Sequence, residues 1–402
     1  MQLLLADALD PTTVEALEAL GHSVGADPSL NPDTLAGALA GVDVLVVRST
    51  KVPAGAIEAA DRLQLIIRAG AGTNTIDVQA AADNGVYVAN VPGRNAVAVA
   101  ELTLGLLLAI DRRIVDNVTD LRAGQWNKKA YSQAGGLLGR TIGVVGLGSI
   151  GLAVAERAVA FGLKVTSVRR PNRDPAIEQR IRSLGIRLVD SLEELVETAD
   201  IVSLHIPAAA ETKGLFGADL LGRMKQGAIF INTARGDVVD AAALGDAIEK
   251  RGLRVGLDVY PDEPSGGAAE WTSELASHPS VVGTHHIGAS TDQAQAAIAA
   301  GVVEIIEAYG QGEILNCVNL EERPLGTCTL HVRHYDRVGV LASVLAELRG
   351  HDLNVKQMEN RVFEGSNAAV AIIHVAGTVD DELLDIISGL ENVIHATRVG
   401  AN

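Results

Sequence analysis

The chain has 402 residues, a formal net charge of −17, 48% hydrophobic residues and 21% charged residues. This is the composition of a globular protein, and the length allows two or three domains. The acidic balance argues against a general nucleic-acid binder, which would need a basic surface, and the two cysteines suggest no disulfide framework.

Neither an export signal nor a membrane span is expected. The first residues, MQLLLADALDP, have a short apolar run and several acids, unlike a signal peptide. The most apolar segment, from Ala96 to Ile110, contains Glu101 and is about 15 residues long, below the roughly 20 needed to cross a bilayer. This segment predicts a long buried helix, which is a candidate for a subunit contact. We expect a cytoplasmic protein.

Short apolar runs alternate with helical patterns, in one block before Pro92 and a second from about Thr141 to Val282. Apolar strands separated by helices are typical of parallel sheets covered on both faces. Another amphipathic helix follows His286. The expected strands are LLLAD, DVLVVRS, LIIRAG and VYVANV in the first block, and TIGVVGLG, KVTSV, IVSLHIP, AIFINT, VGLDVY and VVGTHH in the second.

The pattern changes after Asn316, where NCVNLEERPLG is polar and contains a proline, as in a linker. The rest of the chain predicts strand, helix, strand, strand, helix and strand, the ferredoxin-like βαββαβ order. We therefore expect an α/β protein with two doubly wound parallel-sheet domains followed by this third domain. The first domain, flavodoxin-like, comprises residues 1–92 and 287–316, the second, a Rossmann domain, residues 93–286, and the third residues 326–402.

The motif GLGSIG, from Gly146 to Gly151, follows the predicted strand TIGVV and precedes a helix. Gly146 permits a tight turn, Gly148 lets the backbone approach a pyrophosphate, and Gly151 lets helix and strand pack closely. The helix N-terminus at Ser149 and Ile150 offers free N–H groups to a phosphate. The pattern predicts a dinucleotide site, and the alternative is a purely structural glycine turn.

The next strand, KVTSV, ends at Arg169 and Arg170, where an acid would bind the ribose hydroxyls of NAD. An arginine can instead bind the 2′-phosphate of NADP. Together with Arg173, this pair favours NADP over NAD as the cofactor. The alternative is that Arg169 points to solvent or lies on the adenine ring, and that NAD binds without the carboxylate.

Polar residues follow three later strands. They are Arg235 in INTARGDVVD, Asp258 and Glu263 in GLDVYPDEP, and His286 in THHIGAST. Taken singly, each is more often a surface charge or a structural histidine. Because ligands bind at the carboxyl ends of parallel strands, their shared position predicts a reaction centre.

In these motifs the chain resembles the D-2-hydroxyacid dehydrogenase family. The resemblance spans roughly residues 45–295, in the family's order and spacing. The matching motifs are RAGAGTNTID, GLGSIG, LHIP, NTARG, DVYPDEP and HIGAST. It implies hydride transfer between a nicotinamide cofactor, NAD or NADP, and a small anionic 2-hydroxy acid.

The resemblance also implies roles for single residues. Arg235 would bind the substrate carboxylate and the adjacent oxygen, and His286 would exchange the hydroxyl proton. Glu263 would hydrogen-bond the other ring nitrogen of His286, and Asp258 would orient the nicotinamide carboxamide. Further implied contacts are the backbone of Gly70, Ala71 and Gly72 for the carboxylate, and His205, Pro207, Thr212, Thr233, Ala234 and Gly288 for the cofactor.

A second histidine stands at position 285, where the family usually has proline, so His286 is the match. Neighbours on an extended chain point in opposite directions, so one of the two should face the substrate. A metal site built on His285 and His286 is not expected, because no Cys or carboxylate spacing supports it.

The loop VVRSTKV follows a strand of the first domain and carries Arg48, Ser49 and Lys51. Such a basic loop fits the phosphate of 3-phospho-D-glycerate, and a surface charge cluster is the alternative. In this loop the chain resembles the branch of the family whose members oxidise 3-phospho-D-glycerate to 3-phosphooxypyruvate in L-serine biosynthesis. An NADPH-dependent reductase of glyoxylate or hydroxypyruvate is one alternative, and a nucleotide-sensing regulatory protein is another.

The βαββαβ tail looks like an ACT domain, a small regulatory module. Its serine-sensing version usually reads His-x-Asn-x-Pro-Gly in the first loop. Here His334 matches, Asp336 replaces the Asn, Val338 replaces the Pro, and Asn354 matches a second amide position. A pair of such domains would hold the effector L-serine at a shared edge in a homodimer or homotetramer. A tail that serves only for oligomerisation is the alternative.

Overall fold

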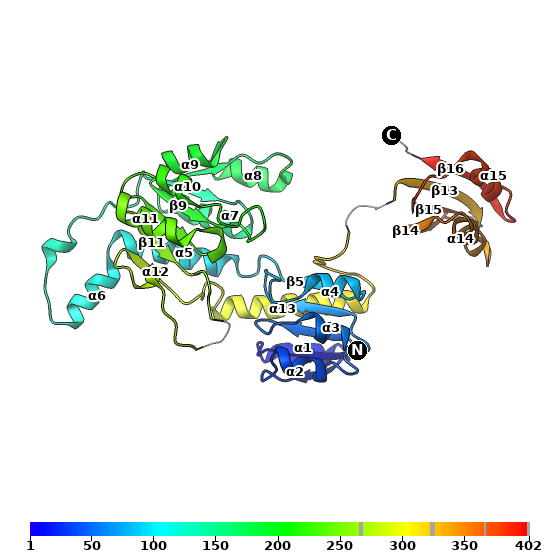
Figure 1. The fold of residues 1–402 in the computed structure, drawn as a ribbon, viewed down its shortest axis with the longest axis horizontal. Coiled ribbons are helices and arrows are strands. Elements are labelled where there is room, and N and C mark those ends of the chain that lie inside the picture. Colours follow the sequence, from blue (N-terminus) through cyan, green and yellow to red (C-terminus); the bar gives the residue numbers. More distant parts are fainter. Residues whose placement is uncertain (265–267, 322–325, 366, 400–402) are drawn as a thin grey trace. The chain divides into compact units, whose positions relative to one another are not determined.

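The structure, a computed structural model, forms two compact units. The units are Met1–Asn319 and Leu320–Asn402. The described residues are 1–264, 268–321, 326–365 and 367–399. They contain two parallel sheets in the first unit and one antiparallel sheet in the second (Figure 1), which confirms the expected α/β fold.

The first sheet has five parallel strands in the order β2-β1-β3-β4-β5. The strands are β1 (Gln2–Leu5), β2 (Ser23–Ala26), β3 (Val44–Val47), β4 (Leu65–Arg68) and β5 (Tyr87–Asn90). This is the flavodoxin-like order that the first block predicts. Strand β2 was not expected, because its SVGA sequence lies at the edge of the sheet and lacks a buried apolar run.

Helices cover both faces of this sheet. One face packs against α1 (Thr12–Ala19) and α13 (Asp292–Gly310) through a core that includes Leu17 and Ile298. The other face packs against α2 (Pro32–Ala38), α3 (Ala54–Glu58) and α4 (Val78–Asp83). Because α13 returns from far along the chain to this core, its packing supports the discontinuous first domain, whose bounds stay a prediction.

The second sheet has seven parallel strands in the order β12-β11-β10-β9-β6-β7-β8. They are β6 (Thr141–Val145), β7 (Lys164–Val168), β8 (Arg187–Val189), β9 (Ile201–Leu204), β10 (Ile229–Asn232), β11 (Arg254–Leu257) and β12 (Val281–Gly283). The order is that of a Rossmann fold with a seventh parallel strand. The three-residue strand β8 was missed, because its run is too short to give a periodic signal.

Two sets of helices enclose the second sheet. One set is α5 (Ala96–Asp111), α7 (Ser149–Ala160) and α8 (Pro175–Ser183), and the other is α9 (Leu192–Thr198), α10 (Ala218–Arg223), α11 (Ala241–Arg251) and α12 (Glu274–Ser277). Helix α5 is the expected buried helix, with Leu104 and Leu107 in the core. In the described part of the chain, no helix is both long enough and apolar enough for a membrane span.

Helix α6 (Ile114–Arg122) and the short 3₁₀ helix after it (Lys128–Tyr131) were not expected from the sequence. No residue of α6 is buried in the unit. Its apolar side chains are therefore left on the surface. They are Ile114, Val115, Val118 and Leu121, followed by Trp126.

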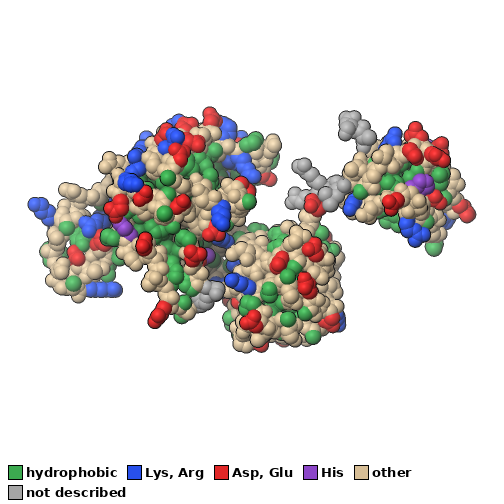
Figure 2. Space-filling model, in the orientation of Figure 1, with side chains coloured by type: hydrophobic (Ala, Val, Ile, Leu, Met, Phe, Trp, Pro, Cys, Tyr) green, Lys and Arg blue, Asp and Glu red, His purple; other side chains and the backbone are tan. Residues whose placement is uncertain are grey.

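The C-terminal unit has four antiparallel strands in the order β14-β15-β13-β16. They are β13 (Cys328–Tyr335), β14 (Asn354–Val362), β15 (Ala368–Ala376) and β16 (Val393–Val399). Helices α14 (Val340–Gly350) and α15 (Asp381–Ser388) pack on its core residues, which include Leu330 and Ile373. This is the predicted ferredoxin-like order. On the face drawn in Figure 2, Lys and Arg side chains are interspersed with Asp and Glu.

Candidate active site

The glycine turn joins β6 to α7 at the carboxyl edge of the second sheet. Gly146 has φ +96°, and a Cβ there would lie 2.5 Å from the carbonyl oxygen of His205. A Cβ on Gly151 would lie 1.8 Å from the carbonyl oxygen of Gly146. Around Gly148, by contrast, no atom lies within 4 Å of an added Cβ. Two glycines therefore permit close packing, and the third leaves open space in front of the helix N-terminus, as a pyrophosphate requires.

His205 follows β9 beside this turn. Its Nε2 lies 2.8 Å from Ser203 Oγ, whereas its Nδ1 is shielded and has no hydrogen-bond partner among the described residues. Although the residue as a whole is partly exposed, desolvation of the ring lowers its pKa to about 3, so the imidazole is neutral near pH 7. An unpartnered ring nitrogen next to the turn fits a polar group of a bound nicotinamide cofactor.

The loop after His205 is closed by a hydroxyl. Thr212 Oγ1 donates to the carbonyl oxygen of Pro207 at 2.7 Å and accepts from the Ala209 N–H at 2.8 Å. The Thr212 side chain thus shapes the loop at this edge of the sheet. Its predicted cofactor contact, like that of Pro207, stays a prediction.

The tip of β7 carries the predicted arginines. Arg169 Nε pairs with Asp190 Oδ1 at 3.2 Å, and both side chains are exposed. Arg170 is also exposed. Arg173 donates from Nη2 to the Val168 carbonyl at 3.3 Å, while its buried Nη1 has no partner in the described ranges. Asp190, which directly follows the neighbouring strand β8, therefore already pairs with the arginine on which the NADP prediction depends.

Arg235 lies in a turn that Asn232 builds after β10. Asn232 Nδ2 donates to the Arg235 carbonyl at 2.8 Å, and its Oδ1 accepts the Ala234 N–H at 3.0 Å. Thr233 is tied to helix α5 by a 3.0 Å contact between its hydroxyl and that of Thr103. These bonds hold the turn rigidly at the edge of the sheet.

The Arg235 guanidinium faces the glycine loop of the first sheet. A Cβ added to Gly72 would lie 2.6 Å from Arg235 Nη2, so the guanidinium lies directly against this glycine. Asn90 Nδ2 holds the same loop by donating to the Ala71 carbonyl at 2.6 Å. Burial lowers the pKa of Arg235, and the charge of Glu263 acts in the opposite direction. The structure thus brings together the predicted carboxylate ligands from both sheets.

His286 and Glu263 form the expected pair, with His286 Nδ1 2.6 Å from Glu263 Oε2. The other carboxylate oxygen accepts the Tyr260 N–H at 2.7 Å. Burial acts to raise the pKa of Glu263, but the hydrogen bonds from His286 and Tyr260 and the nearby charges outweigh it, and the pKa lies below its usual value. The ionised carboxylate therefore holds Nδ1 of His286 and orients the ring.

Asp258 has a structural role that the sequence did not suggest. The carboxylate is buried and accepts from Thr284 Oγ1 at 2.6 Å, Ile287 N at 2.8 Å and Gly288 N at 2.9 Å. His286 stands in the loop between these donors with φ +52°, in the left-handed region that costs a non-glycine residue energy. Asp258 therefore anchors the loop that presents His286. Its expected contact with the nicotinamide carboxamide stays a prediction.

His285, next to the catalytic candidate, is exposed. Across the described residues, no group of three or more His, Cys, Asp or Glu side chains is arranged to hold a metal ion.

The basic loop after β3 is shaped by an acid at the end of β1. Asp7 Oδ2 accepts the N–H groups of Arg48 at 2.7 Å and Thr50 at 3.1 Å. Arg48 is half-buried, and Ser49 and Lys51 are exposed. Burial and, to a smaller extent, the charges of Arg235 and Arg48 lower the pKa of Arg68, at the end of β4. Sequence reasoning missed Arg68 as a site residue, although it begins the RAGAG motif.

The three predicted effector residues of the C-terminal unit lie in different surroundings. His334 is buried, and its Nδ1 lies 2.8 Å from the Tyr335 carbonyl oxygen and its Nε2 3.0 Å from Asn360 Oδ1. Asp336 and Asn354 are exposed. Both ring nitrogens of His334 are thus engaged within the unit, and serine binding stays a prediction.

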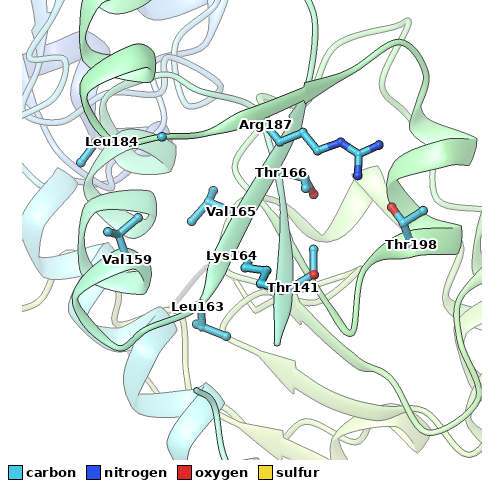
Figure 3. A pocket seen from close by; sticks show the side chains of 10 residues that line it. Thr141, Val159, Leu163, Lys164, Val165, Thr166, Leu184, Arg187 and Thr198 are labelled. Carbon is cyan, nitrogen blue, oxygen red and sulfur yellow. The ribbon is translucent and has the colours of Figure 1, made fainter. Parts of the chain in front are cut away.

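A cavity of about 470 Å³ lies at the other edge of the second sheet. Figure 3 shows its lining side chains, which include Thr141, Lys164 and Arg187 at the starts of β6, β7 and β8. Arg187 pairs with Glu194 at 3.1 Å. The turn at Gly146 and the ring of His286 lie at the carboxyl edge instead, so this cavity is not part of the candidate site.

The comparisons with known proteins agree with this geometry. Residues 104–288 match the family profile described as "D-isomer specific 2-hydroxyacid dehydrogenase, NAD binding domain". The chain is 35% identical over 394 residues to D-3-phosphoglycerate dehydrogenase of Methanocaldococcus jannaschii, covering 96% of this chain and 70% of that one. It is 40% identical over 302 residues to hydroxypyruvate reductase of Thermotoga maritima, covering 74% of this chain and 95% of that one.

A solved structure, that of the TT0316 protein from Thermus thermophilus, superposes with a TM-score of 0.69 at 33% identity. It covers 79% of this chain and 100% of its own. These similarities agree with three features of the structure: the sheet order, the glycine turn and the His286–Glu263 pair. The chain belongs to the D-isomer-specific 2-hydroxyacid dehydrogenase family, and it is an oxidoreductase that uses a nicotinamide cofactor.

Proposed function

We propose that this chain oxidises 3-phospho-D-glycerate to 3-phosphooxypyruvate, the first step of L-serine biosynthesis. The observation that carries the proposal is that the charges of Arg48 and Arg235 act on Arg68, while Arg235 in turn interacts with Glu263 of the His286–Glu263 pair. A carboxylate and a phosphate on one small molecule would match this concentration of positive charge. Its similarity to a named D-3-phosphoglycerate dehydrogenase also supports this substrate.

In the proposed reaction, Arg235 binds the carboxylate with its planar fork of donors. His286 removes the hydroxyl proton through Nε2, because Nδ1 is held by Glu263. The oxidised nicotinamide cofactor, which the turn at Gly146 would hold, would supply the acceptor for the hydride of C2. Glu263, ionised and hydrogen-bonded, stabilises the charged imidazolium that results.

For the cofactor, we infer that the basic tip of β7 favours NADP. Arg173 supports this preference, because its Nη1 is buried and has no partner within the described residues. Asp190 opposes it, because its carboxylate already pairs with Arg169 and would repel a 2′-phosphate. The expected preference is therefore moderate.

A second candidate is a reductase of hydroxypyruvate, favoured by the 40% identity to an enzyme of that name. Initial rates separate the two: 3-phospho-D-glycerate with NAD and with NADP, against hydroxypyruvate and glyoxylate with NADH and NADPH. We expect the largest kcat/KM for phosphorylated substrates in either direction. If the chain reduces hydroxypyruvate but has no activity with phosphorylated substrates, it is the reductase instead.

Assembly and regulation belong to the same proposal. The exposed apolar side chains of α6 fit a contact between two copies of the chain in a homodimer or homotetramer. The C-terminal unit has the order of an ACT domain, and L-serine is its proposed effector.

The free cysteines, Cys317 and Cys328, fit a reducing compartment such as the cytoplasm.

A further inference from the structure

Helix α5 begins at the end of the crossover that joins the first sheet to the second. The crossover leaves β5 beside the glycine loop of the first sheet, where the Val91 N–H donates to the Gly70 carbonyl at 2.9 Å. Gly93 then lies against the glycine turn of the second sheet, because a Cβ added to it would be 3.2 Å from Ser149 Oγ. Asn95, the residue just before α5, therefore follows a segment that contacts both the loop and the turn.

One face of α5 meets the loops of the reaction centre. Residues four apart lie on the same face of a helix. The Val99 N–H donates to the Asn95 carbonyl at 3.1 Å, and Thr103 Oγ1 donates to the Val99 carbonyl at 2.8 Å. Val99 lies against Gly288, where an added Cβ would be 3.3 Å from Val99 Cγ2. Thr103 contacts the Thr233 hydroxyl. Asn95 is the first residue of this row.

The side-chain oxygen of Asn95 has no donor among the described residues. Oδ1 is shielded from solvent, yet no residue in the described ranges donates a hydrogen bond to it, and the side chain makes no capping bond to α5. A buried acceptor without a donor costs free energy, and folded proteins usually avoid it. Because this oxygen begins the row that faces the catalytic loops, it indicates a donor that comes from a bound ligand.

The carboxamide group of a nicotinamide cofactor is a donor of this kind, since it carries two N–H groups. Its expected acceptor is Asp258, whose carboxylate has about four lone-pair positions. Three of them already accept from Thr284 Oγ1, the Ile287 N–H and the Gly288 N–H. Two donors therefore need a second acceptor, and Asn95 begins the face of α5 that contacts Gly288 in this loop.

We propose that Asn95 Oδ1 accepts a hydrogen bond from the carboxamide amino group of the nicotinamide cofactor and positions the ring for hydride transfer. Asp258 accepts the other N–H. The inference goes beyond the proposed function, because it applies whichever 2-hydroxy acid is the substrate. A chain without activity on 3-phospho-D-glycerate would end the proposed function and leave the assignment of Asn95 unaffected.

The test compares two cofactors that differ only at this amino group. In 3-acetylpyridine adenine dinucleotide a methyl group replaces the amino group of NAD, so this analogue cannot donate. The dissociation constants of both are measured by isothermal titration calorimetry on the full chain without substrate, with the 2′-phosphorylated pair in parallel. The unmodified chain should bind NAD at least about tenfold more tightly than the analogue.

Asn95→Leu has a similar shape and no acceptor. It should lower the preference for NAD over the analogue by about fivefold to tenfold, through weaker binding of NAD, while binding of the analogue changes less than about twofold. The Tm of the cofactor-free chain should not fall, because Oδ1 has no partner within the described residues. Equal weakening of both cofactors, or an unchanged preference, would overturn the proposal.

Two further variants serve as controls. Asn84→Leu, at an exposed asparagine that follows α4, should leave both dissociation constants unchanged. Asn95→Asp keeps an oxygen acceptor on a side chain of the same length and should retain the preference for NAD. Loss of the preference in Asn95→Asp would also contradict the proposal, because it would show that an acceptor at this position is not what the cofactor requires.

Discussion

His286 in the first unit and His334 in the C-terminal unit stand in opposite surroundings. The His286 side chain is 50% exposed, one ring nitrogen is held by Glu263, and the backbone is in the left-handed region. His334 is 1% exposed, and both of its ring nitrogens are engaged. One ring can therefore exchange a proton with a ligand, and the other holds two strands together. The partners of the two ring nitrogens distinguish these roles, and residue type does not.

The sharpest test of this contrast is His286→Gln. Without a group to take the hydroxyl proton, kcat for 3-phospho-D-glycerate should fall by about 10³–10⁴-fold. His285→Gln is the matched control and should retain activity within about threefold, because that neighbour is exposed and has no assigned part. Near-normal turnover by His286→Gln would remove the distinction between the two histidines.

Glu263→Gln should have the next largest effect, because the amide cannot stabilise the imidazolium by charge. We expect kcat to fall by about 10–100-fold. The pKa of Glu263 is lowered in the folded chain, so its contribution to stability is present above its ordinary value of 4.5 and is lost as the pH falls through the lowered pKa. The Tm difference between this variant and the unmodified chain should therefore shrink below about pH 4.5. A difference that grows on acidification would contradict this assignment.

Arg169→Asp extends the contrast between engaged and available side chains to the cofactor site. There, Arg169 is paired with Asp190 but remains exposed. Replacing the cation by an acid should lower the ratio of kcat/KM for NADP over NAD by about tenfold or more. Arg182→Asp, the same charge change on α8, should leave the ratio unaltered. An unchanged ratio in Arg169→Asp would remove Arg169 from cofactor selection.

His334→Gln should have the smallest effect on turnover. Because the ring bridges the Tyr335 carbonyl and Asn360, its loss should cost the C-terminal unit about 1–3 kcal/mol of unfolding free energy. We expect kcat and KM without effector to stay within about twofold. Thermal unfolding and initial rates on the same sample test both statements. A large loss of turnover with unchanged stability would reverse the roles of the two histidines.

Much of the fold and of the site could be predicted from local patterns. The turn at Gly146, the strand before Arg235 and the βαββαβ order are set by residues close together in the sequence. The structure contains all three features. Strands β2 and β8 were missed because they are short, and α6 because its apolar side chains face away from the core. Pattern reasoning detects buried faces, and these elements present little buried surface.

The amino-acid sequence by itself determined the order of the elements, the glycine turn and the identity of the groups at the carboxyl edges, because backbone preferences and apolar periodicity act over a few residues. Only the tertiary structure decided which charges meet. Arg48, Arg68 and Arg235 lie at or after the ends of three separate strands, and Asp258 reaches the loop of His286 from the end of another. Electrostatic energy depends on distance in space and on loss of water, and neither is a property of position along the chain.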